Sequence, residues 1–184
     1  MNVRDDQRDR VVKAMAEHLL DTGLSQASLR QLAAAAGVSD RMLLYYFTDK
    51  TEVLALAMQN LAGGMAAQLE TALPADQRLS QAALTAKAAR LVVDPVFRPF
   101  MRLWIEAIAA AARQEPPFDV IARQIGEGFL AWIEARLDPA LVSDPPGAAA
   151  TILALIDGLA LLEVCGGEDR VLKAVAALEA ASLG

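Results

Sequence analysis

The stretch SLRQLAAAAGVSDRMLLYYFTDK, residues 28–50, decides the fold of the N-terminal part of this chain. Ser28 can cap a helix, and Gln31 three residues later completes a capping box. Gly37 follows a run of alanines, where the chain needs a residue that tolerates positive φ in order to turn. Ser39 can then cap a second short helix, and Asp49 with Glu52 is expected to form another capping box at the start of a third. Two short helices joined by a turn that contains glycine indicate a helix-turn-helix, whose second helix enters the DNA major groove.

The same residues resemble the tetracycline-repressor (TetR) family of bacterial transcription regulators. The similarity runs from about Arg8 to Met58 and includes LRQLAAAAGVS, the LxxYF pattern ending at Leu43, Tyr46 and Phe47, and the DK-T-E-V-L start of the next helix. The resemblance implies a three-helix DNA-binding head, a ligand-binding body and a homodimer.

The periodicity of the rest of the chain predicts an all-α fold, because no segment alternates between apolar and polar residues over the length of a strand. We expect a DNA-binding head over residues 1–50 and a helical bundle for ligand binding and dimerisation over residues 51–184. Gly63 and Gly64 indicate a bend or a close helix approach within the helix expected after the head. Helices are expected over residues 8–20, 28–36, 40–47, 52–73, 77–93, 100–114, 118–137, 148–165 and 168–183.

Charge and cysteine content limit the possible environments of the chain. The net charge is −6, but the first 50 residues hold seven basic and seven acidic side chains, so the whole excess of acid lies in residues 51–184. An acidic body limits non-specific DNA binding, and the balance neither proves nor excludes a DNA-binding role. Cys165 is the only cysteine, which excludes a disulfide framework and fits a reducing cytoplasm. The charged N-terminus is not a signal peptide.

One face of the second helix of the motif is predicted to reach the bases. Leu43 and Phe47 lie four residues apart and should be buried, which leaves the opposite face free. Arg41 is the natural guanine reader, because its planar guanidinium matches two acceptors in the major groove, although an ordinary solvated arginine is the alternative. The predicted residues of this face are Asp40, Arg41, Met42, Leu44 and Tyr45.

Other DNA contacts follow from the resemblance. It implies that Arg30 touches DNA and that Tyr46 and Lys50 hold phosphate oxygens. Ser28 and Ser39, with the helix starts that they cap, can add further donors to phosphates.

Three residues depart from the family pattern or from simple electrostatics. Met42 and Leu44 stand where the family commonly has threonine and an aromatic residue, so apolar contacts with thymine methyl groups can replace polar ones. Asp40 is repelled by phosphate. It either favours the start of its own helix or accepts a hydrogen bond from cytosine N4, and both interpretations stay open.

A methionine- and aromatic-rich set in the body indicates an apolar ligand pocket, although the same pattern is also typical of a packed core. The resemblance implies an inducer pocket in this part of the chain. We expect the residues of that pocket to be Met58, Met65, Phe100, Met101, Trp104 and Phe129.

The apolar segment over residues 148–165 is too short on either side of Asp157 to favour a membrane span. In the family, the last long helices of two subunits form a four-helix bundle, so the segments over residues 118–137 and 148–165 are expected to form the dimer interface. The predicted interface residues are Trp132, Ile152, Leu155, Ile156, Leu159 and Leu162.

No catalytic, cofactor or metal site is predicted, because His18 is the only histidine and neither glycine pair belongs to a phosphate-binding loop. Cys165 is expected to be a small buried apolar side chain. These observations favour a cytoplasmic, ligand-responsive DNA-binding regulator, most simply a repressor. The alternatives are an all-helical small-molecule carrier and a protein-interaction module.

Overall fold

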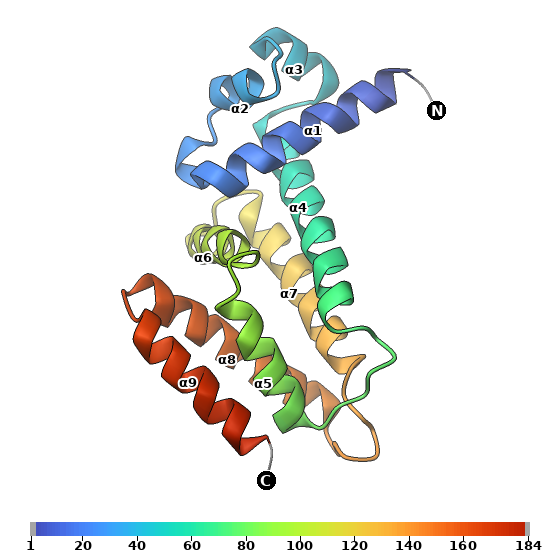
Figure 1. Ribbon diagram of the computed structural model, residues 1–184. Helices are drawn as coiled ribbons and strands as arrows, with labels where there is room; N and C mark the ends of the chain where they lie inside the picture. The colour runs from blue at the N-terminus through green and yellow to red at the C-terminus, as the bar shows by residue number, and fades with distance from the viewer. Residues whose placement is uncertain (1–2, 183–184) are drawn as a thin grey trace. The chain divides into compact units, whose positions relative to one another are not determined.

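The computed structural model describes residues 3–182, which form nine α-helices and one short 3₁₀ helix (Figure 1). No strand occurs within this range; one isolated parallel β-bridge joins Leu79 and Leu137. The all-α prediction is confirmed. The elements are α1 (Val3–Thr22), η1 (Leu24–Gln26), α2 (Leu29–Ala35), α3 (Asp40–Tyr46), α4 (Lys50–Ala72), α5 (Gln81–Val92), α6 (Arg98–Ala112), α7 (Phe118–Glu134), α8 (Pro145–Val164) and α9 (Glu168–Ala181).

The helices are distributed over two compact units that do not follow the order of the chain. Unit 1 comprises the residues up to Ala67 together with Leu103–Arg123, and unit 2 comprises Gln68–Arg102 together with the residues from Gln124 onward. The helices α4, α6 and α7 each contribute residues to both units. The helix-turn-helix belongs entirely to unit 1.

The turn after α1 in unit 1 depends on a glycine for two reasons. Gly23 has a φ of 77°, a conformation that residues with a side chain rarely adopt. A Cβ atom at this position would also lie 2.5 Å from Oε1 of Glu106 on α6. The carboxylate is held there because its Oε2 accepts a 2.7 Å hydrogen bond from the N–H of Leu24. The sequence pattern predicted the end of α1 here, but not the contact with α6.

The long helix α4 differs in two details from the sequence-based expectation. It runs without interruption through Gly63 and Gly64, and a Cβ atom at either glycine would meet nothing within 4 Å. The glycines therefore neither interrupt α4 nor, among the described residues, permit the close helix approach that was one of the two expectations. At its start, Asp49 accepts a hydrogen bond from the N–H of Glu52 (2.9 Å), as expected, but Glu52 accepts in return from Thr48 (2.6 Å) and not from Asp49.

Aliphatic side chains, most of them alanine and leucine, form the core of unit 2, where α5 packs against α8 and α9. The helix α8 begins three residues earlier than expected. Asp144 caps it by accepting a hydrogen bond from the N–H of Gly147 (3.1 Å), and the two prolines occupy its first turn. Proline is tolerated there because the first helical N–H groups have no partner within the helix. The core residues are Leu73, Leu84, Ala88, Ile133, Leu137, Val142, Ala148, Ala149 and Ile152.

A buried arginine joins the ends of α4 and α7 in unit 2. Arg136 is 2% exposed, and its Nε donates to the carbonyl of Leu73 (2.6 Å) while Nη1 donates to the carbonyl of Trp132 (2.9 Å). Its Nη2 forms an ion pair with Glu70, and its guanidinium lies 3.9 Å from the centre of the Trp132 ring. A buried arginine with all of these partners fixes the position of the last turn of α4 relative to α7.

By length and composition, α8 is the one helix within residues 3–182 that could cross a membrane, with a mean hydropathy of 1.8 over an 18-residue window. Core helices of soluble proteins pass the same test. Five residues of α8 are buried in unit 2, but only 28% of the window is buried inside the chain. One side of α8 is therefore packed in the core of its own chain, and apolar side chains on another side remain exposed.

Candidate functional site

Local hydrogen bonds shape the helix-turn-helix as predicted. The Ser28 hydroxyl accepts a hydrogen bond from the N–H of Gln31 while the Gln31 side chain accepts from the N–H of Ser28, both at 3.3 Å. Gly37 has a φ of 66°, and nothing crowds the place of a Cβ atom, so backbone conformation alone favours glycine here. Ser39 caps α3 by accepting from the N–H of Met42 at 3.1 Å.

The two faces of α3 differ sharply in exposure. Leu43 is fully buried and Phe47, directly after the helix, is 2% exposed, so these residues hold α3 against the head. On the other side, Met42, Leu44 and Tyr45 are 44%, 49% and 65% exposed. Three exposed large side chains on one seven-residue helix are consistent with a binding surface.

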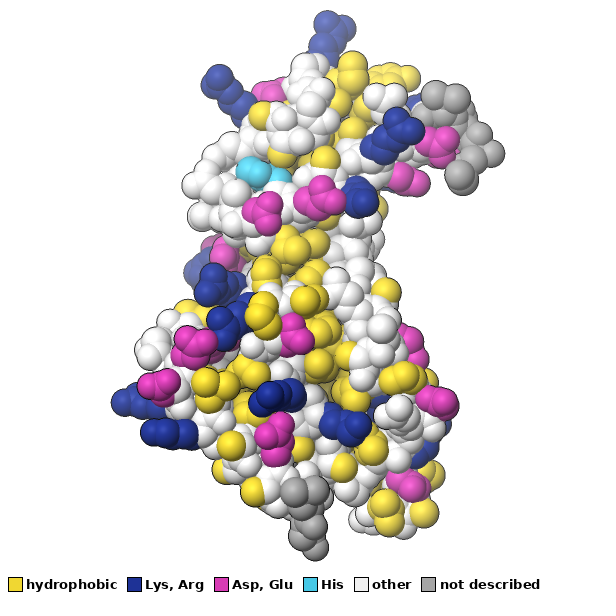
Figure 2. All heavy atoms as spheres, viewed as in Figure 1, with side chains coloured by type: hydrophobic (Ala, Val, Ile, Leu, Met, Phe, Trp, Pro, Cys, Tyr) yellow, Lys and Arg dark blue, Asp and Glu magenta, His cyan; other side chains and the backbone are white. Residues whose placement is uncertain are grey.

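Polar and charged residues surround this apolar face. Asp40 and Arg41 are exposed at the start of α3, and Tyr46 is half-buried with its ring 5.6 Å from that of Tyr45. Figure 2 shows basic side chains projecting beside hydrophobic ones from the surface formed by α2 and α3. The remaining predicted DNA-contact residues are also exposed in the head: Ser28, Arg30, Ser39 and Lys50.

Two arginines of α1 also reach this region, and sequence reasoning missed them. The guanidinium of Arg4 lies 5.0 Å from the centre of the Tyr45 ring, and that of Arg8 lies 5.0 Å from the centre of the Phe47 ring. Arg8 also forms a 3.1 Å ion pair with Glu52. The only sequence signal was the charge of the first ten residues, because these contacts join parts of the chain about forty residues apart.

One carboxylate supports the start of α4. The N–H of Thr48 holds the pKa of Glu52 below its usual value, and Arg8 contributes to the same shift. The Glu52 carboxylate ties α1 to the residues between α3 and α4 through these two contacts. Lys50 therefore follows directly after a turn that these contacts hold in place.

The six residues predicted for the ligand pocket are divided between the two units. Met58, Met65 and Trp104 belong to unit 1, whereas Phe100, Met101 and Phe129 belong to unit 2. Neither unit by itself therefore assembles the predicted set. Met58 is 3% exposed and Met101 is 7% exposed, and the other four are half-buried.

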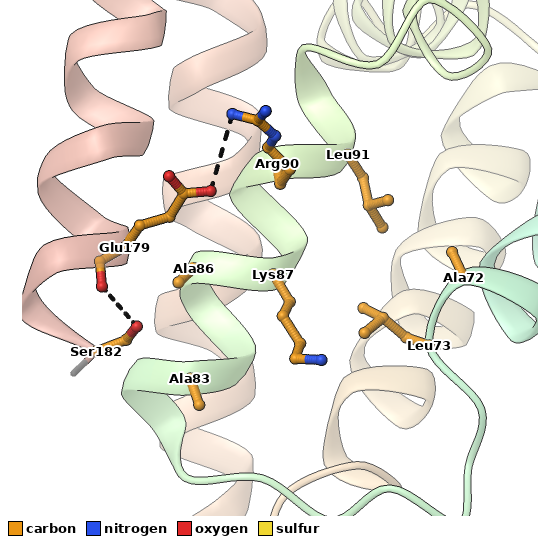
Figure 3. A pocket seen from close by; sticks show the side chains of 9 residues that line it. All are labelled: Ala72, Leu73, Ala83, Ala86, Lys87, Arg90, Leu91, Glu179 and Ser182. Atoms are coloured by element: carbon orange, nitrogen blue, oxygen red, sulfur yellow. Dashed lines mark hydrogen bonds and ion pairs between the residues drawn. The ribbon is translucent and has the colours of Figure 1, made fainter.

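A groove of about 510 Å³ lies within unit 2 and contains none of those six residues (Figure 3). It is formed by the end of α4, one side of α5 and the last turns of α9. No sequence signal pointed to it, because its walls come from three segments that only the fold brings together. Its lining residues are Ala72, Leu73, Ala83, Ala86, Lys87, Arg90, Leu91, Glu179 and Ser182.

The residues predicted for the dimer interface have different environments. Ile152 and Leu159 are 1% and 7% exposed, and Ile152 belongs to the core cluster of its own unit. The apolar side chains that α8 leaves most exposed are Leu161 and Val164, at 51% and 58%. Four predicted residues are half-buried: Trp132, Leu155, Ile156 and Leu162.

Within residues 3–182, no group of three histidine, cysteine or acidic side chains is arranged to hold a metal ion. His18 is half-buried in α1. The expectation for Cys165 is wrong: the side chain is exposed, because the residue lies at the C-cap of α8 where the chain turns away through Gly166.

Comparisons with known proteins agree with this arrangement. Residues 12–57 match the family model for the bacterial regulatory proteins of the tetR family, and residues 80–182 match the model for the C-terminal part of BetI-type transcriptional repressors. The HTH-type transcriptional regulator BetI of Cronobacter sakazakii is 28% identical over 169 residues, which cover 88% of this chain and 81% of that protein.

Solved structures share the fold. A transcriptional regulator from Rhodococcus sp. Rha1 has a TM-score of 0.73 at 24% identity, covering 96% of this chain and 95% of its own. The multidrug binding protein EbrR, solved in complex with proflavin, has a TM-score of 0.65 at 21% identity, covering 94% and 99%.

The second family model alone spans more than half of the chain, and the first coincides with the helix-turn-helix described above. The predicted resemblance is therefore confirmed. The chain belongs to the TetR family of ligand-responsive, DNA-binding transcriptional regulators, which are not enzymes.

Proposed function

We propose that this regulator is a homodimeric, cytoplasmic repressor that reads a pseudo-palindromic operator with α3 and is released from it by a small ligand bound in the body. The observation that carries the proposal is the exposed face of α3, where three large apolar side chains lie among exposed polar and charged ones. A surface of this kind suits the mixed donor, acceptor and methyl pattern of the major groove.

Base reading is assigned to the residues of that face. Arg41 is exposed at the start of α3, from where its guanidinium can donate two hydrogen bonds to a guanine. Met42 and Leu44 would contact thymine methyl groups. Asp40 accepts from cytosine N4 or serves only the start of its helix, and a change of base preference in Asp40→Ala separates these two roles.

Orientation on the duplex is assigned to contacts with phosphates. The exposed Lys50 at the start of α4 and the Tyr46 hydroxyl would hold phosphate oxygens, joined by Arg30 and by the hydroxyl groups of Ser28 and Ser39. These contacts favour no particular sequence. They add affinity that falls as the salt concentration rises.

Dimerisation is assigned to the surface of α8 that unit 2 leaves uncovered, together with α7. A helix with a mean hydropathy of 1.8 and only 28% of its apolar window buried within one chain favours coverage by a second copy. Members of this family are typically dimers. Two recognition helices related by a two-fold axis would lie about 34–36 Å apart, one turn of DNA.

A single charged substitution on the exposed side of α8 tests the proposed dimer. Leu161→Glu should shift the chain toward a monomer in sedimentation at micromolar concentration, because a carboxylate would be buried without a partner. Leu141→Glu is the matched control, since Leu141 is 67% exposed in the connection before α8. A wild-type chain that sediments as a monomer would contradict the proposed assembly.

Ligand control is supported by the family and by EbrR, which was solved in complex with proflavin. A ligand can weaken operator binding only by the difference in its affinity for two states of the regulator. The methionine and aromatic side chains remain the predicted site for an apolar ligand. Trp104→Ala should lower the affinity for an apolar ligand without weakening operator binding by the ligand-free protein.

Selection of bound duplexes from a random-sequence pool tests the whole proposal. The expected result is a pseudo-palindromic motif whose half-sites lie about 10 base pairs apart, or somewhat more. Expression from a promoter that carries the motif should fall when the regulator is present. If the selection enriched no motif, the result would favour a small-molecule carrier or a protein-interaction module instead.

A further inference from the structure

The groove in unit 2 combines an apolar wall with positive charge. Much of the lining is aliphatic, with Ala72 and Leu73 at the end of α4 and Ala83, Ala86 and Leu91 on α5. Figure 3 shows Lys87 extending from α5 along this wall, while Arg90 points from the next turn of α5 toward α9.

The charges of the groove are not balanced. Arg90 Nη1 lies 3.8 Å from Glu179 Oε1, and these two side chains are 65% and 45% exposed. A pair at this distance and exposure contributes little binding energy. Within the part of the chain that the structure describes, no carboxylate forms an ion pair with Lys87. Two cations therefore face one acid, and one of the cations has no partner.

We infer that this groove is a binding site for a small amphipathic monoanion, a molecule with one carboxylate or similar acidic group and an aliphatic body. The acid is held by Lys87, and Arg90, which points toward α9 in the structure, joins it by turning away from its exposed pair with Glu179. The aliphatic body lies along Leu73, Ala83 and Leu91 and removes their apolar surface from water. A volume of about 510 Å³ is within the range of small-molecule sites.

The groove is a different site from the apolar pocket predicted among the methionine and aromatic residues, and it takes a different class of ligand. An amphipathic cation does not fit, because it would place its charge beside Lys87 and Arg90. A purely apolar molecule would leave Lys87 without a counter-charge. The proposed binding does not require operator recognition, so each can fail without the other.

The experiment uses the full chain and decanoate as the probe, below its micelle-forming concentration, with titration calorimetry as the readout. One decanoate per chain is expected. Decanol tests the need for the charge, and decyltrimethylammonium tests its sign; both should bind more weakly than decanoate at the same chain length.

Variants of the groove locate the binding. Lys87→Ala and Arg90→Ala should each weaken decanoate binding about three- to tenfold, the range expected for a charge-assisted hydrogen bond at a partly exposed site. Lys173→Ala is the matched control, because Lys173 is an exposed lysine of α9 that does not line the groove. Ala83→Phe should block binding by filling the apolar wall.

The most informative variant is Glu179→Gln, which should strengthen decanoate binding because it frees Arg90 from its only acidic partner in the groove. A gain in affinity cannot result from misfolding. The inference would be overturned by equal affinity for decanoate and decyltrimethylammonium, by wild-type affinity in both Lys87→Ala and Ala83→Phe, or by weaker binding in Glu179→Gln. Operator binding measured with the same variants should be unchanged in the absence of decanoate.

Discussion

Two arginines that lie against aromatic rings have different roles in the two units. In unit 1 the Arg4 guanidinium is 5.0 Å from the centre of the Tyr45 ring, and both side chains are exposed. In unit 2 the Arg136 guanidinium is 3.9 Å from the centre of the Trp132 ring, and Arg136 is 2% exposed. The buried arginine donates to two carbonyls and a carboxylate of its own chain, whereas the guanidinium of Arg4 is exposed, so its donors can reach another molecule. Burial, and not the arginine–aromatic contact itself, separates a structural side chain from one that can bind DNA.

The largest effect is expected from the buried arginine. Arg136→Ala should lower the free energy of unfolding by about 3 kcal/mol, because it leaves buried carbonyls without donors and opens a space beside Trp132. Urea unfolding at a fixed protein concentration measures this difference. Arg170→Ala, on the exposed side of α9, should change stability by less than about 0.5 kcal/mol. A loss below about 1 kcal/mol for Arg136→Ala would mean that the two arginines do not differ as described.

The exposed arginine should show the opposite behaviour. Arg4→Ala should leave stability unchanged but weaken operator binding, and the slope of log affinity against log salt should become shallower by about 0.9 if one phosphate contact is lost. Arg10→Ala is the control, because Arg10 is exposed on another side of α1. Equal salt slopes in both variants would remove Arg4 from the DNA-binding surface.

Arg8 lies between these two cases. Its ion pair with Glu52 is 3.1 Å long, both side chains are 34% exposed, and its guanidinium also lies against Phe47. Arg8→Ala should therefore cost about 0.5–1 kcal/mol of stability, the range for a partly exposed ion pair with a ring contact. Thermal unfolding of Arg4→Ala, Arg8→Ala and Arg136→Ala under the same conditions should show a loss of stability that increases with the burial of the arginine. A loss as large as that of Arg136→Ala would break this ranking.

The smallest effect is a dependence on pH at the start of α4. The Thr48 N–H, with help from Arg8, lowers the pKa of Glu52 below its ordinary value of 4.5. A lowered pKa in the folded state stabilises the protein above the unfolded pKa, and this contribution is lost as the pH falls through the folded value. The stability difference between wild type and Glu52→Gln should be constant above pH 5 and should shrink at lower pH. A stability difference that stayed constant down to the pH of acid unfolding would contradict the lowered pKa of Glu52.

The head could be predicted in detail because its determinants are local in the sequence. Ser28 and Gln31 form the expected capping box, and Gly37 has the expected positive φ. The same local reasoning failed by one residue at α4, where Glu52 accepts from Thr48 and not from Asp49. Which backbone N–H the Glu52 carboxylate reaches depends on the conformation of the turn as well as on the spacing of the residues.

The body could be predicted only as a set of helices. Periodicity located α8, but it did not tell the core residue Ile152 from the exposed Leu161, because the helix is apolar on all sides. The buried Arg136 was also missed, since its acceptor at Leu73 is 63 residues away in the chain. A charged residue in a helical pattern is normally solvated, and only the fold shows that this one is paired and buried.

The most direct test of the central claim compares the DNA sequences selected by the wild-type chain with those selected by Arg41→Ala and Lys50→Ala. The exposed face of α3 is proposed to read bases, and the start of α4 is proposed to hold phosphate. Arg41→Ala should lose preference at one position in each half-site and weaken specific binding by about 1–3 kcal/mol. Lys50→Ala should weaken binding to all duplexes alike and retain the wild-type motif. An unchanged motif in Arg41→Ala, or an altered motif in Lys50→Ala, would contradict this division of roles.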